Sequence, residues 1–296
     1  RTFRMLMNGA KTKALALVNA NKNDADARYY LGAVYGVLAG YEASTARKFF
    51  AAMRNGSRSV EQHQQVLKLN PNYYAAYLTV GLYDYVVGNL PFALKAIAAL
   101  GGVRGNKERG IRQLKQIIEN KAENADDARV MLLAIYQQEK QPAEALQLLK
   151  GLSERFPQNF LFKLELAAVH SQLNQPAEAI GIFENLLKSA NQNAQLKRSL
   201  DLVYFQFGEA LSALNEHERA AAQFLAASKE PGAEQGLATF AVLRAAQSLD
   251  LAGKRNEAIT QYKTVLARQN VYDSRERAEK GIKTPFRESD RSRKSE

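Results

Sequence analysis

The chain has 296 residues, of which 46% are hydrophobic and 24% charged, and this balance is typical of a protein with a buried core. It contains no cysteine, which excludes disulfides, thiolate metal ligands and a cysteine nucleophile. No apolar run reaches the roughly 20 residues that a membrane-spanning helix requires, and Asp84 interrupts the most apolar stretch. We therefore expect no transmembrane segment.

The net charge of +11 is concentrated in the first part of the chain. Residues 1–121 contain 18 Lys and Arg against 7 Asp and Glu, whereas residues 122–296 contain 23 of each kind. This imbalance indicates either a solvated basic face or a surface that docks onto an acidic partner or an acidic surface. The basic residues do not form one run with aromatic residues between them, so we expect no nucleic-acid partner.

The residue types favour helices throughout. Ala, Leu, Gln, Glu, Lys and Arg dominate, and the Val, Ile and Thr alternation of a sheet protein is missing. Most of the 7 prolines fall where a helix would start or stop, as Pro142 and Pro176 do. The sequence predicts an all-α fold.

Two segments of nearly identical sequence lie 34 residues apart: QPAEALQLLKGL begins at Gln141 and QPAEAIGIFENL at Gln175. This period is typical of the tetratricopeptide repeat, in which helix A packs against helix B. Small residues are needed at about positions 8, 20 and 27 of the unit, where the backbones approach, and large ones at about positions 4, 7, 11 and 24.

In chain order, residues 1–24 are predicted to form a half repeat that consists of a helix B alone. Its apolar residues Leu6, Leu15 and Val18 would then lack the cover of a helix A. The first complete unit begins at Ala25, and its second helix extends as far as the LNPN sequence at 69–72. The second unit begins at Tyr74, with its helix B running from Ala93 to Leu100.

Residues 106–120 are predicted to form an extra amphipathic helix, inserted before four further units that begin at Asp126, Phe160, Asp201 and Thr239. We therefore predict a right-handed α-solenoid of about six tetratricopeptide-like helix pairs over residues 25–272. Residues 273–296 would form a C-terminal capping helix and a polar basic tail.

The stretch VGLYDYVVGNLPFALKAIAALGGVRGNKERGIRQL, residues 80–114, resembles the divergent family of eukaryotic tetratricopeptide repeat protein 39 and its bacterial relatives. The matching features are the Gly-aromatic start, the Leu-Pro pair at 90–91, and the glycine-rich turn before a charged Gly-Ile helix. Asn106 departs from the pattern, which has an acidic residue there. The resemblance implies an interaction protein and not an enzyme.

The concave groove of such a fold is lined by helix A. The corresponding residues are mostly apolar and are Tyr29, Leu78, Leu82, Tyr85, Val130, Leu164, Phe205, Phe240 and Leu243. They do not include the Lys, Arg and Asn set that captures the terminal carboxylate of a peptide. The groove is predicted either to receive an apolar helical segment of a partner or to be filled by packing within the chain.

The sequence therefore predicts a non-catalytic scaffold for protein–protein interaction. It could assemble head to tail into an oligomer or filament, if the segment from Val271 onward covers Leu6, Leu15 and Val18 of the next copy. The alternatives are a monomeric adaptor that binds an apolar client helix and a peripheral component of an envelope complex. Either way, the partner is a protein.

Residues that could carry chemistry are few. The three histidines fall in different parts of the chain and complete no metal-binding set, and no acid–base pair has a workable spacing, so we expect no metal, cofactor or catalytic activity. The first residue is Arg1 and not Met, which suggests either a chain whose signal peptide was removed or a trimmed one. We expect an extracytoplasmic or secreted protein, with a cytoplasmic one as the alternative.

Overall fold

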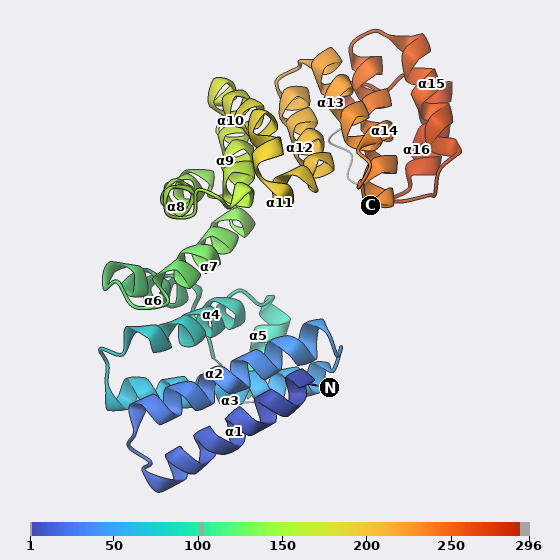
Figure 1. Ribbon diagram of the computed structural model, residues 1–296. Coiled ribbons are helices and arrows are strands. Elements are labelled where there is room, and N and C mark those ends of the chain that lie inside the picture. Colours follow the sequence, from blue (N-terminus) through green and yellow to red (C-terminus); the bar gives the residue numbers. More distant parts are fainter. Residues whose placement is uncertain (1, 101–103, 291–296) are drawn as a thin grey trace. The chain divides into compact units, whose positions relative to one another are not determined.

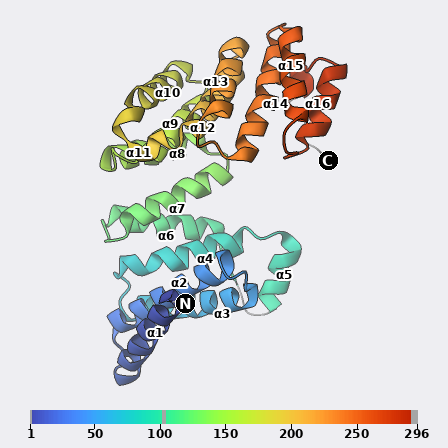
Figure 2. The same ribbon diagram turned by 45° about the vertical axis from the view of Figure 1, so that its right-hand side comes forward.

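The computed structural model describes residues 2–100 and 104–290, apart from the side chains of Phe49, Ile97 and Ala98. The predicted all-α class is confirmed, since the described residues form α-helices and short 3₁₀ turns with no strand. The helices form two compact units, residues 1–139 (unit 1) and residues 140–296 (unit 2). Figures 1 and 2 show the helices in chain order from blue to red.

The helices of unit 1 are α1 (Thr2–Ala20), α2 (Ala25–Ser44), α3 (Phe49–Leu69), η1 (Tyr74–Ala76), α4 (Tyr77–Gly88), α5 (Phe92–Leu100), α6 (Lys107–Glu119) and α7 (Ala125–Gln138). The helices of unit 2 are α8 (Pro142–Arg155), α9 (Phe160–Gln172), α10 (Pro176–Ser189), η2 (Ala190–Gln192), α11 (Ala194–Lys197), α12 (Leu200–Ala213), α13 (His217–Lys229), α14 (Gln235–Leu251), α15 (Arg255–Leu266), α16 (Ser274–Lys283) and η3 (Glu288–Asp290).

The pair α2 and α3 crosses at a glycine. Asp24 caps the start of α2 by accepting the N–H of Ala27 at 2.9 Å. A Cβ on Gly32 would lie 2.6 Å from Nδ1 of His63 in α3, so only glycine lets the two helices come this close. The Ser59 hydroxyl, buried between them, donates to the carbonyl of Gly32 at 2.7 Å.

In the second pair, the partner of α4 is α6. The two helices are in close backbone contact: a Cβ on Gly110 of α6 would lie 2.6 Å from the backbone nitrogen of Tyr85 in α4. Leu114 and Ile117 of α6 are fully buried. The structure therefore differs from the predicted pairing, because the segment assigned to helix B, Ala93–Leu100, lies in α5, and the segment assigned to an inserted helix is the true partner.

An ion pair between a buried carboxylate and a half-exposed arginine joins the two helices. Asp84, which interrupts the apolar stretch of α4, has a side chain that is 4% exposed. Its carboxylate accepts two hydrogen bonds of 2.6 Å from the guanidinium of Arg109 in α6. Asn106, at the point where the chain departs from the resemblance, caps α6 by accepting the N–H of Arg109 at 2.7 Å. Asp84 thus joins α4 to α6, although it interrupts the apolar stretch of α4.

In unit 2 the predicted repeat positions are borne out by burial. The four alanines at the tight crossings, Ala145, Ala179, Ala220 and Ala258, are each 0% exposed. The large residues four positions later, Leu149, Phe183, Phe224 and Tyr262, are 0–1% exposed. Small side chains let the helices approach, and the large ones fill the space beside the crossing.

The turns between helix A and helix B share one backbone feature. The fifteenth residue of each of the last four units, counted from the predicted start, has a left-handed φ: 55° at Lys140, 55° at Asn174, 61° at Asn215 and 75° at Gly253. A left-handed residue ends a helix and reverses the chain within a few residues. The four units therefore share a backbone conformation at this turn as well as a packing pattern.

The end of unit 2 is closed by α16, which lies in the segment predicted to form a capping helix. Ala278 of α16 is 0% exposed, and a Cβ on Gly281 would lie 2.5 Å from Cε1 of Tyr262 in α15. Arg255 of α15 donates to the carbonyls of Gly281 and Ile282 at 2.8 and 2.7 Å. Helix α16 thus packs on its own chain. Residues 291–296 of the predicted tail lie outside the described residues.

Candidate functional site

The predicted groove residues of unit 1 have different surroundings. Leu82 and Val130 are 36% and 38% exposed, and Leu78 is half-buried. Tyr85 is buried, and its hydroxyl donates to Oε1 of Glu139 at 2.9 Å. The Tyr29 ring meets the rings of Tyr30 and His63 edge-on and lies tilted against that of Tyr73, in the loop after α3. Only Leu82 and Val130 therefore present an open apolar surface.

Two of these tyrosines are held protonated. Burial raises the pKa of Tyr29 to about 12, and the negative charge of Glu123 acts in the same direction. Burial, and the hydrogen bond to Glu139, raise the pKa of Tyr85 to about 12. Both phenols remain neutral donors at physiological pH, so neither is prepared to act as a base.

The predicted groove residues of unit 2 are largely core. Leu164 and Leu243 are 1% and 0% exposed. Phe205 and Phe240 are half-buried and pack against each other with ring centroids 5.9 Å apart; Phe205 also contacts Phe224 at 5.4 Å. The packing alternative left open by the sequence therefore describes these four side chains in this structure.

The residues predicted for self-association also differ in their exposure. Leu6 of α1 is 60% exposed, whereas Val18 is buried and Leu15 packs beside it against α2. The C-terminal segment predicted to cover them on the next copy includes α16, which is already packed on α14 and α15. Helix α16 therefore has packing partners within its own unit, and its predicted contact with the next copy stays a prediction.

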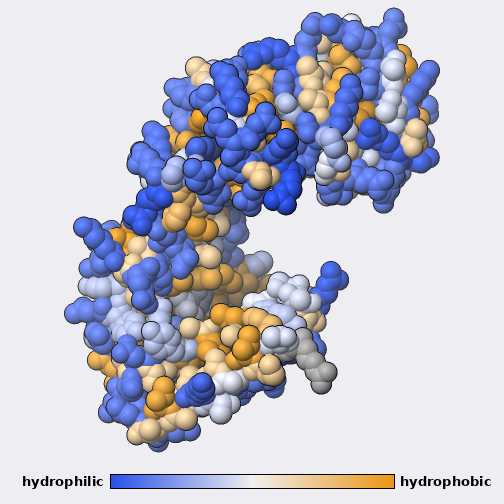
Figure 3. Space-filling model, in the orientation of Figure 1, coloured by the Kyte–Doolittle hydropathy of each residue, from blue (hydrophilic) through white to orange (hydrophobic). Residues whose placement is uncertain are grey.

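One group of exposed apolar side chains was not predicted from the sequence. It comprises Val37 of α2, Phe50 and Met53 of α3, and Phe92, Leu94 and Leu100 of α5, and we call it the α5 surface. Phe50, Phe92 and Leu100 are 90%, 87% and 91% exposed. Both ribbon views place α5 beside the end of unit 1 where α2 ends and α3 begins, and Figure 3 shows apolar side chains gathered over α2 and α5.

The chain segments that contribute most of the α5 surface carry basic residues and no acidic ones. Residues 43–60 and 85–107, which contain most of it, include Arg47, Lys48, Arg54, Arg58, Lys95, Arg104 and Lys107 and no Asp or Glu. A contiguous apolar patch of this kind is unusual on a monomer, so the α5 surface is a candidate interaction surface. The sequence contains a signal for it, the apolar and acid-free FALKAIAAL segment, but repeat alignment assigned that segment to the core.

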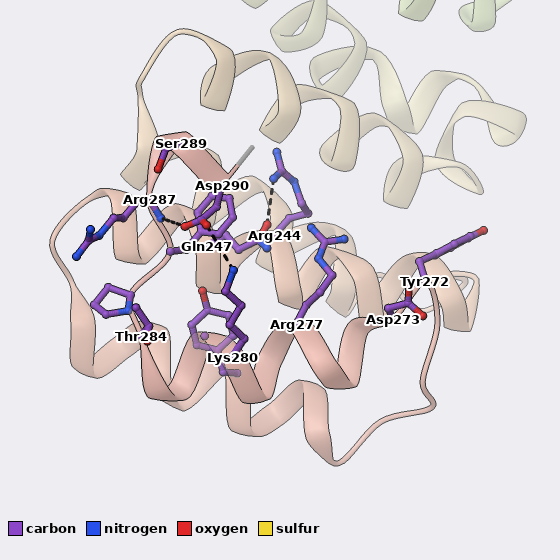
Figure 4. A pocket seen from close by; sticks show the side chains of 14 residues that line it. Arg244, Gln247, Tyr272, Asp273, Arg277, Lys280, Thr284, Arg287, Ser289 and Asp290 are labelled. Carbon is purple, nitrogen blue, oxygen red and sulfur yellow. Dashed lines mark hydrogen bonds and ion pairs between the residues drawn. The ribbon is translucent and has the colours of Figure 1, made fainter. Parts of the chain in front are cut away.

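A second site is a cavity of about 900 Å³ in unit 2, between α14, α16 and the strap formed by residues 284–290 (Figure 4). Basic side chains dominate its charged lining, which includes Arg244, Arg277, Lys280 and Arg287 with Asp273 and Asp290. Tyr272 forms part of its rim and is 77% exposed. A cavity of this size is in the range of ligand-binding pockets.

The signal for this cavity was also present in the sequence. Gly281 stands eight positions into a unit begun at Ser274, the small-residue position of a helix A, and this register places Arg277 and Lys280 one turn apart. Arg277 and Lys280 fall at positions 4 and 7 of this register, where the other units are expected to carry large packing residues, and basic residues at both positions are the signal.

No helix in the described part of the chain is both long enough and apolar enough to cross a membrane. Within the same residues, no group of three or more His, Asp or Glu side chains is placed to hold a metal ion. His63 and His170 are buried and bonded locally, Nδ1 of His63 lying 2.8 Å from the Ser59 carbonyl and Nδ1 of His170 lying 2.6 Å from Oε1 of Gln175. Both rings serve packing here.

Comparison with known proteins gives the family of the repeat. Residues 136–203 match the model of a tetratricopeptide repeat family. Yeast Tom70 is 12% identical with a TM-score of 0.46, over 94% of this chain and 58% of Tom70. A human IFIT1 dimer with PPP-AAAA is 15% identical, with a TM-score of 0.35, over 88% of this chain and 68% of that chain.

The tetratricopeptide repeat domain of P58(IPK) is 15% identical, with a TM-score of 0.24, over 88% of this chain and 79% of that domain. No curated protein matches the chain in sequence. The family model covers part of the chain only, but the burial pattern of the four repeated crossings extends beyond it. The match assigns tetratricopeptide repeat sequence to residues 136–203, and the helix pairs of unit 2 follow the same packing pattern.

Proposed function

We propose that this chain is a non-catalytic scaffold that holds a protein partner on the α5 surface of unit 1. The observation that carries the proposal is the exposure of α5: all of its described side chains are exposed, although most of them are apolar. Fully burying one large apolar side chain contributes roughly 1.5–3 kcal/mol, so a partner that covered Phe50, Phe92 and Leu100 would offset a large part of the cost of association.

The charge around the surface indicates what kind of partner fits. An apolar helix flanked by acidic residues would cover the apolar side chains and face Arg47, Lys48 and Lys95 with opposite charge. Two copies paired through the same surface would instead bring two acid-free basic segments together. We therefore favour an adaptor that binds a client helix over pairing between like surfaces. Head-to-tail assembly, with the segment from Val271 onward on Leu6, Leu15 and Val18 of the next copy, stays a prediction.

The resemblance of residues 80–114 to the tetratricopeptide repeat protein 39 family supports the same class of function, because that family implies interaction and not catalysis. The fold also agrees, since helical repeats present extended surfaces to partners. The buried position of Leu164 and Leu243 argues against the groove of unit 2 as an apolar docking site in this conformation.

A photo-crosslinking experiment tests the proposal in intact cells. A photoreactive phenylalanine analogue at position 92 should capture a specific protein, and the same analogue at position 161 should not; Leu161 is also an exposed apolar residue, 43% exposed, but lies in α9 of unit 2. The double change Phe92→Asp and Leu94→Asp should abolish capture from a second reactive position, Met53. Light scattering at rising concentration then distinguishes a client from another copy.

The proposal fails if position 92 captures nothing, or captures the same proteins as position 161. It fails in its choice of partner if the chain forms oligomers that Phe92→Asp and Leu94→Asp convert to monomers.

A further inference from the structure

The cavity of unit 2 contains an arginine that the fold does not neutralise. Arg244 is held by Glu209 of α12 through two hydrogen bonds of 2.6 and 2.7 Å. Lys280 lies 3.4 Å from a carboxylate oxygen of Asp290. Among the described contacts Arg277 has neither a hydrogen bond nor an ion pair; its guanidinium lies over the ring of Phe240, 5.4 Å from the centroid.

The position of Arg277 is costly for a cation. It is half-buried on α16, and Figure 4 shows its side chain extending beside that of Arg244 from the neighbouring helix. Burial is the main factor that lowers the pKa of Arg277, and the positive charge of Arg244 lowers it further. Asp273 and Glu209 partly offset this effect, and Glu209 is already engaged by Arg244. An additional anion beside Arg277 would relieve the cost.

The cavity already receives one carboxylate from its own chain. The strap that forms one wall is anchored by the N–H of Phe286, which donates to Asp250 at 2.8 Å. This anchor places Asp290 at Lys280, where its other oxygen accepts the N–H of Arg287 at 3.0 Å. The lining thus already holds one carboxylate, that of Asp290 in the short helix η3, against the ammonium group of Lys280.

Tyr272 adds an aromatic side chain to the rim of the cavity. The Tyr272 ring is 77% exposed and meets the Phe240 ring edge-on with centroids 5.8 Å apart, so an apolar platform lies next to the Arg277 guanidinium. The volume of about 900 Å³ exceeds what a small inorganic anion would fill. A peptide carries both a carboxylate and apolar side chains and matches the two kinds of surface.

We infer that the cavity between α14, α16 and the strap binds an acidic peptide segment, with a Glu or Asp carboxylate at Arg277 and an adjacent apolar side chain on Tyr272. This site is separate from the α5 surface and does not depend on the function proposed for it. The guanidinium donates its N–H groups to the two oxygens of the carboxylate, an arrangement that lysine cannot reproduce.

Fluorescence anisotropy on the full chain tests the inference with three labelled probes. They are a short glutamate-rich peptide, the same peptide with glutamine in place of each glutamate, and a single-stranded RNA oligonucleotide. Glutamate-peptide binding should be measurable and should weaken as salt is added, whereas the glutamine peptide should bind at least about tenfold more weakly. The RNA probe should not compete.

Substitutions in α16 test whether glutamate-peptide binding depends on Arg277. Arg277→Gln should weaken glutamate-peptide binding about tenfold or more, and Arg277→Lys should recover part of it because the charge returns without the planar fork. Arg275→Gln is the matched control, since Arg275 is exposed on the same helix and does not line the cavity. The control should bind as the parent does. Circular dichroism verifies that each variant keeps its helix content.

Three results would overturn the inference: equal binding of the two peptides, equal weakening by Arg275→Gln and Arg277→Gln, or Arg277-dependent binding of RNA in place of the peptide. If Arg277→Gln does not fold, Arg277→Lys and Tyr272→Ser take its place, and unchanged binding in both would have the same consequence.

Discussion

At the scale of single residues, glycines set how closely the helices of unit 1 approach. Gly110 of α6 lies against the backbone of α4. A Cβ added at Gly110 would be nearest to backbone atoms of Gly81 and Tyr85. These are backbone atoms, which cannot rotate away as a side chain end can. A methyl group at this position must therefore push α4 and α6 apart.

We predict that Gly110→Ala destabilises the chain by about 1–3 kcal/mol, the usual cost of overpacking. Gly56→Ala is the control, because Gly56 also lies inside a helix and has no atom near its missing Cβ. That change should leave stability unchanged or raise it by up to about 1 kcal/mol, through the better helix propensity of alanine. Chemical denaturation measures both, and equal effects of the two changes would contradict the α4–α6 contact.

His63 gives unit 1 a dependence on pH. The ring is buried beside Gly32 and the edge of Tyr29, and burial lowers its pKa. The folded state therefore keeps His63 neutral at a pH where the unfolded chain already binds a proton. Stability is complete above about pH 6.5, the ordinary imidazole pKa, and falls as the pH drops from there toward the lowered pKa of the folded state.

We predict that His63→Gln reduces this loss of stability between neutral and mildly acidic pH. The midpoint of thermal unfolding, followed by circular dichroism at a series of pH values, should fall less steeply for the variant than for the parent. The other histidines and the carboxylates are common to both chains, so the difference between the two curves reports His63. Parallel curves would mean that its protonation does not distinguish the folded from the unfolded state.

At the scale of helices, the repeat pattern predicts pairing well where each unit is short and regular. Ala179 and Phe183, or Ala220 and Phe224, are four residues apart on one helix, and the sequence alone fixes their role because nothing separates helix A from helix B except a tight turn. After α4 two candidate helices follow, and both carry small and large residues at suitable spacing. The correct partner depends on Gly110 and on the ion pair of Arg109 with Asp84, which are contacts distant in sequence.

The candidate sites were less predictable than the fold for the same reason. The exposure of Phe92 and Leu100 cannot be predicted without knowing that α6, and not α5, packs against α4. The role of Arg277 depends on which of its neighbours is already paired, and Glu209, which holds Arg244, lies far earlier in the sequence. Repeat alignment assigns a residue to a face, but it does not say which charges on that face remain free.

The contrast between α5 and α6 gives a direct test at this scale. Leu100 of α5 is 91% exposed and Leu114 of α6 is 0% exposed, although repeat alignment assigns Leu100 to the core. We predict that Leu100→Ala changes the free energy of unfolding by less than about 0.5 kcal/mol, as at most surface positions. Leu114→Ala should cost about 2–5 kcal/mol because it leaves a cavity.

Denaturation curves of the two alanine variants, recorded beside the parent, decide between the pairings. A large loss for Leu100→Ala with little change for Leu114→Ala would restore the pairing expected from the sequence.

At the scale of the whole molecule, the two units differ in charge and in the kind of surface they offer. Residues 1–139 contain 19 Lys and Arg against 11 Asp and Glu, and residues 140–296 contain 22 against 19. Most exposed large apolar side chains belong to unit 1, and unit 2 contributes only Phe156, Leu161 and Tyr272 among the described residues. Unit 1 is thus suited to an apolar partner, and unit 2 to a polar one.

This division predicts that the two binding activities can be separated. The cavity of unit 2 is formed by α14, α16 and the strap, and the ion pair that orients Arg244 comes from α12, so every group that the peptide requires lies in residues 140–296. The buried clusters around Phe183 and Phe224 and around Tyr262 also lie wholly within that range. A fragment of residues 140–296 should therefore unfold cooperatively and bind the glutamate peptide with an affinity close to that of the full chain. It should lack the partner captured at position 92, because α5 is absent.

Thermal unfolding and the same anisotropy titration measure the two properties. A folded fragment that does not bind the peptide, in the presence of binding by the full chain, would show that unit 1 contributes to the site and that the two activities are not independent.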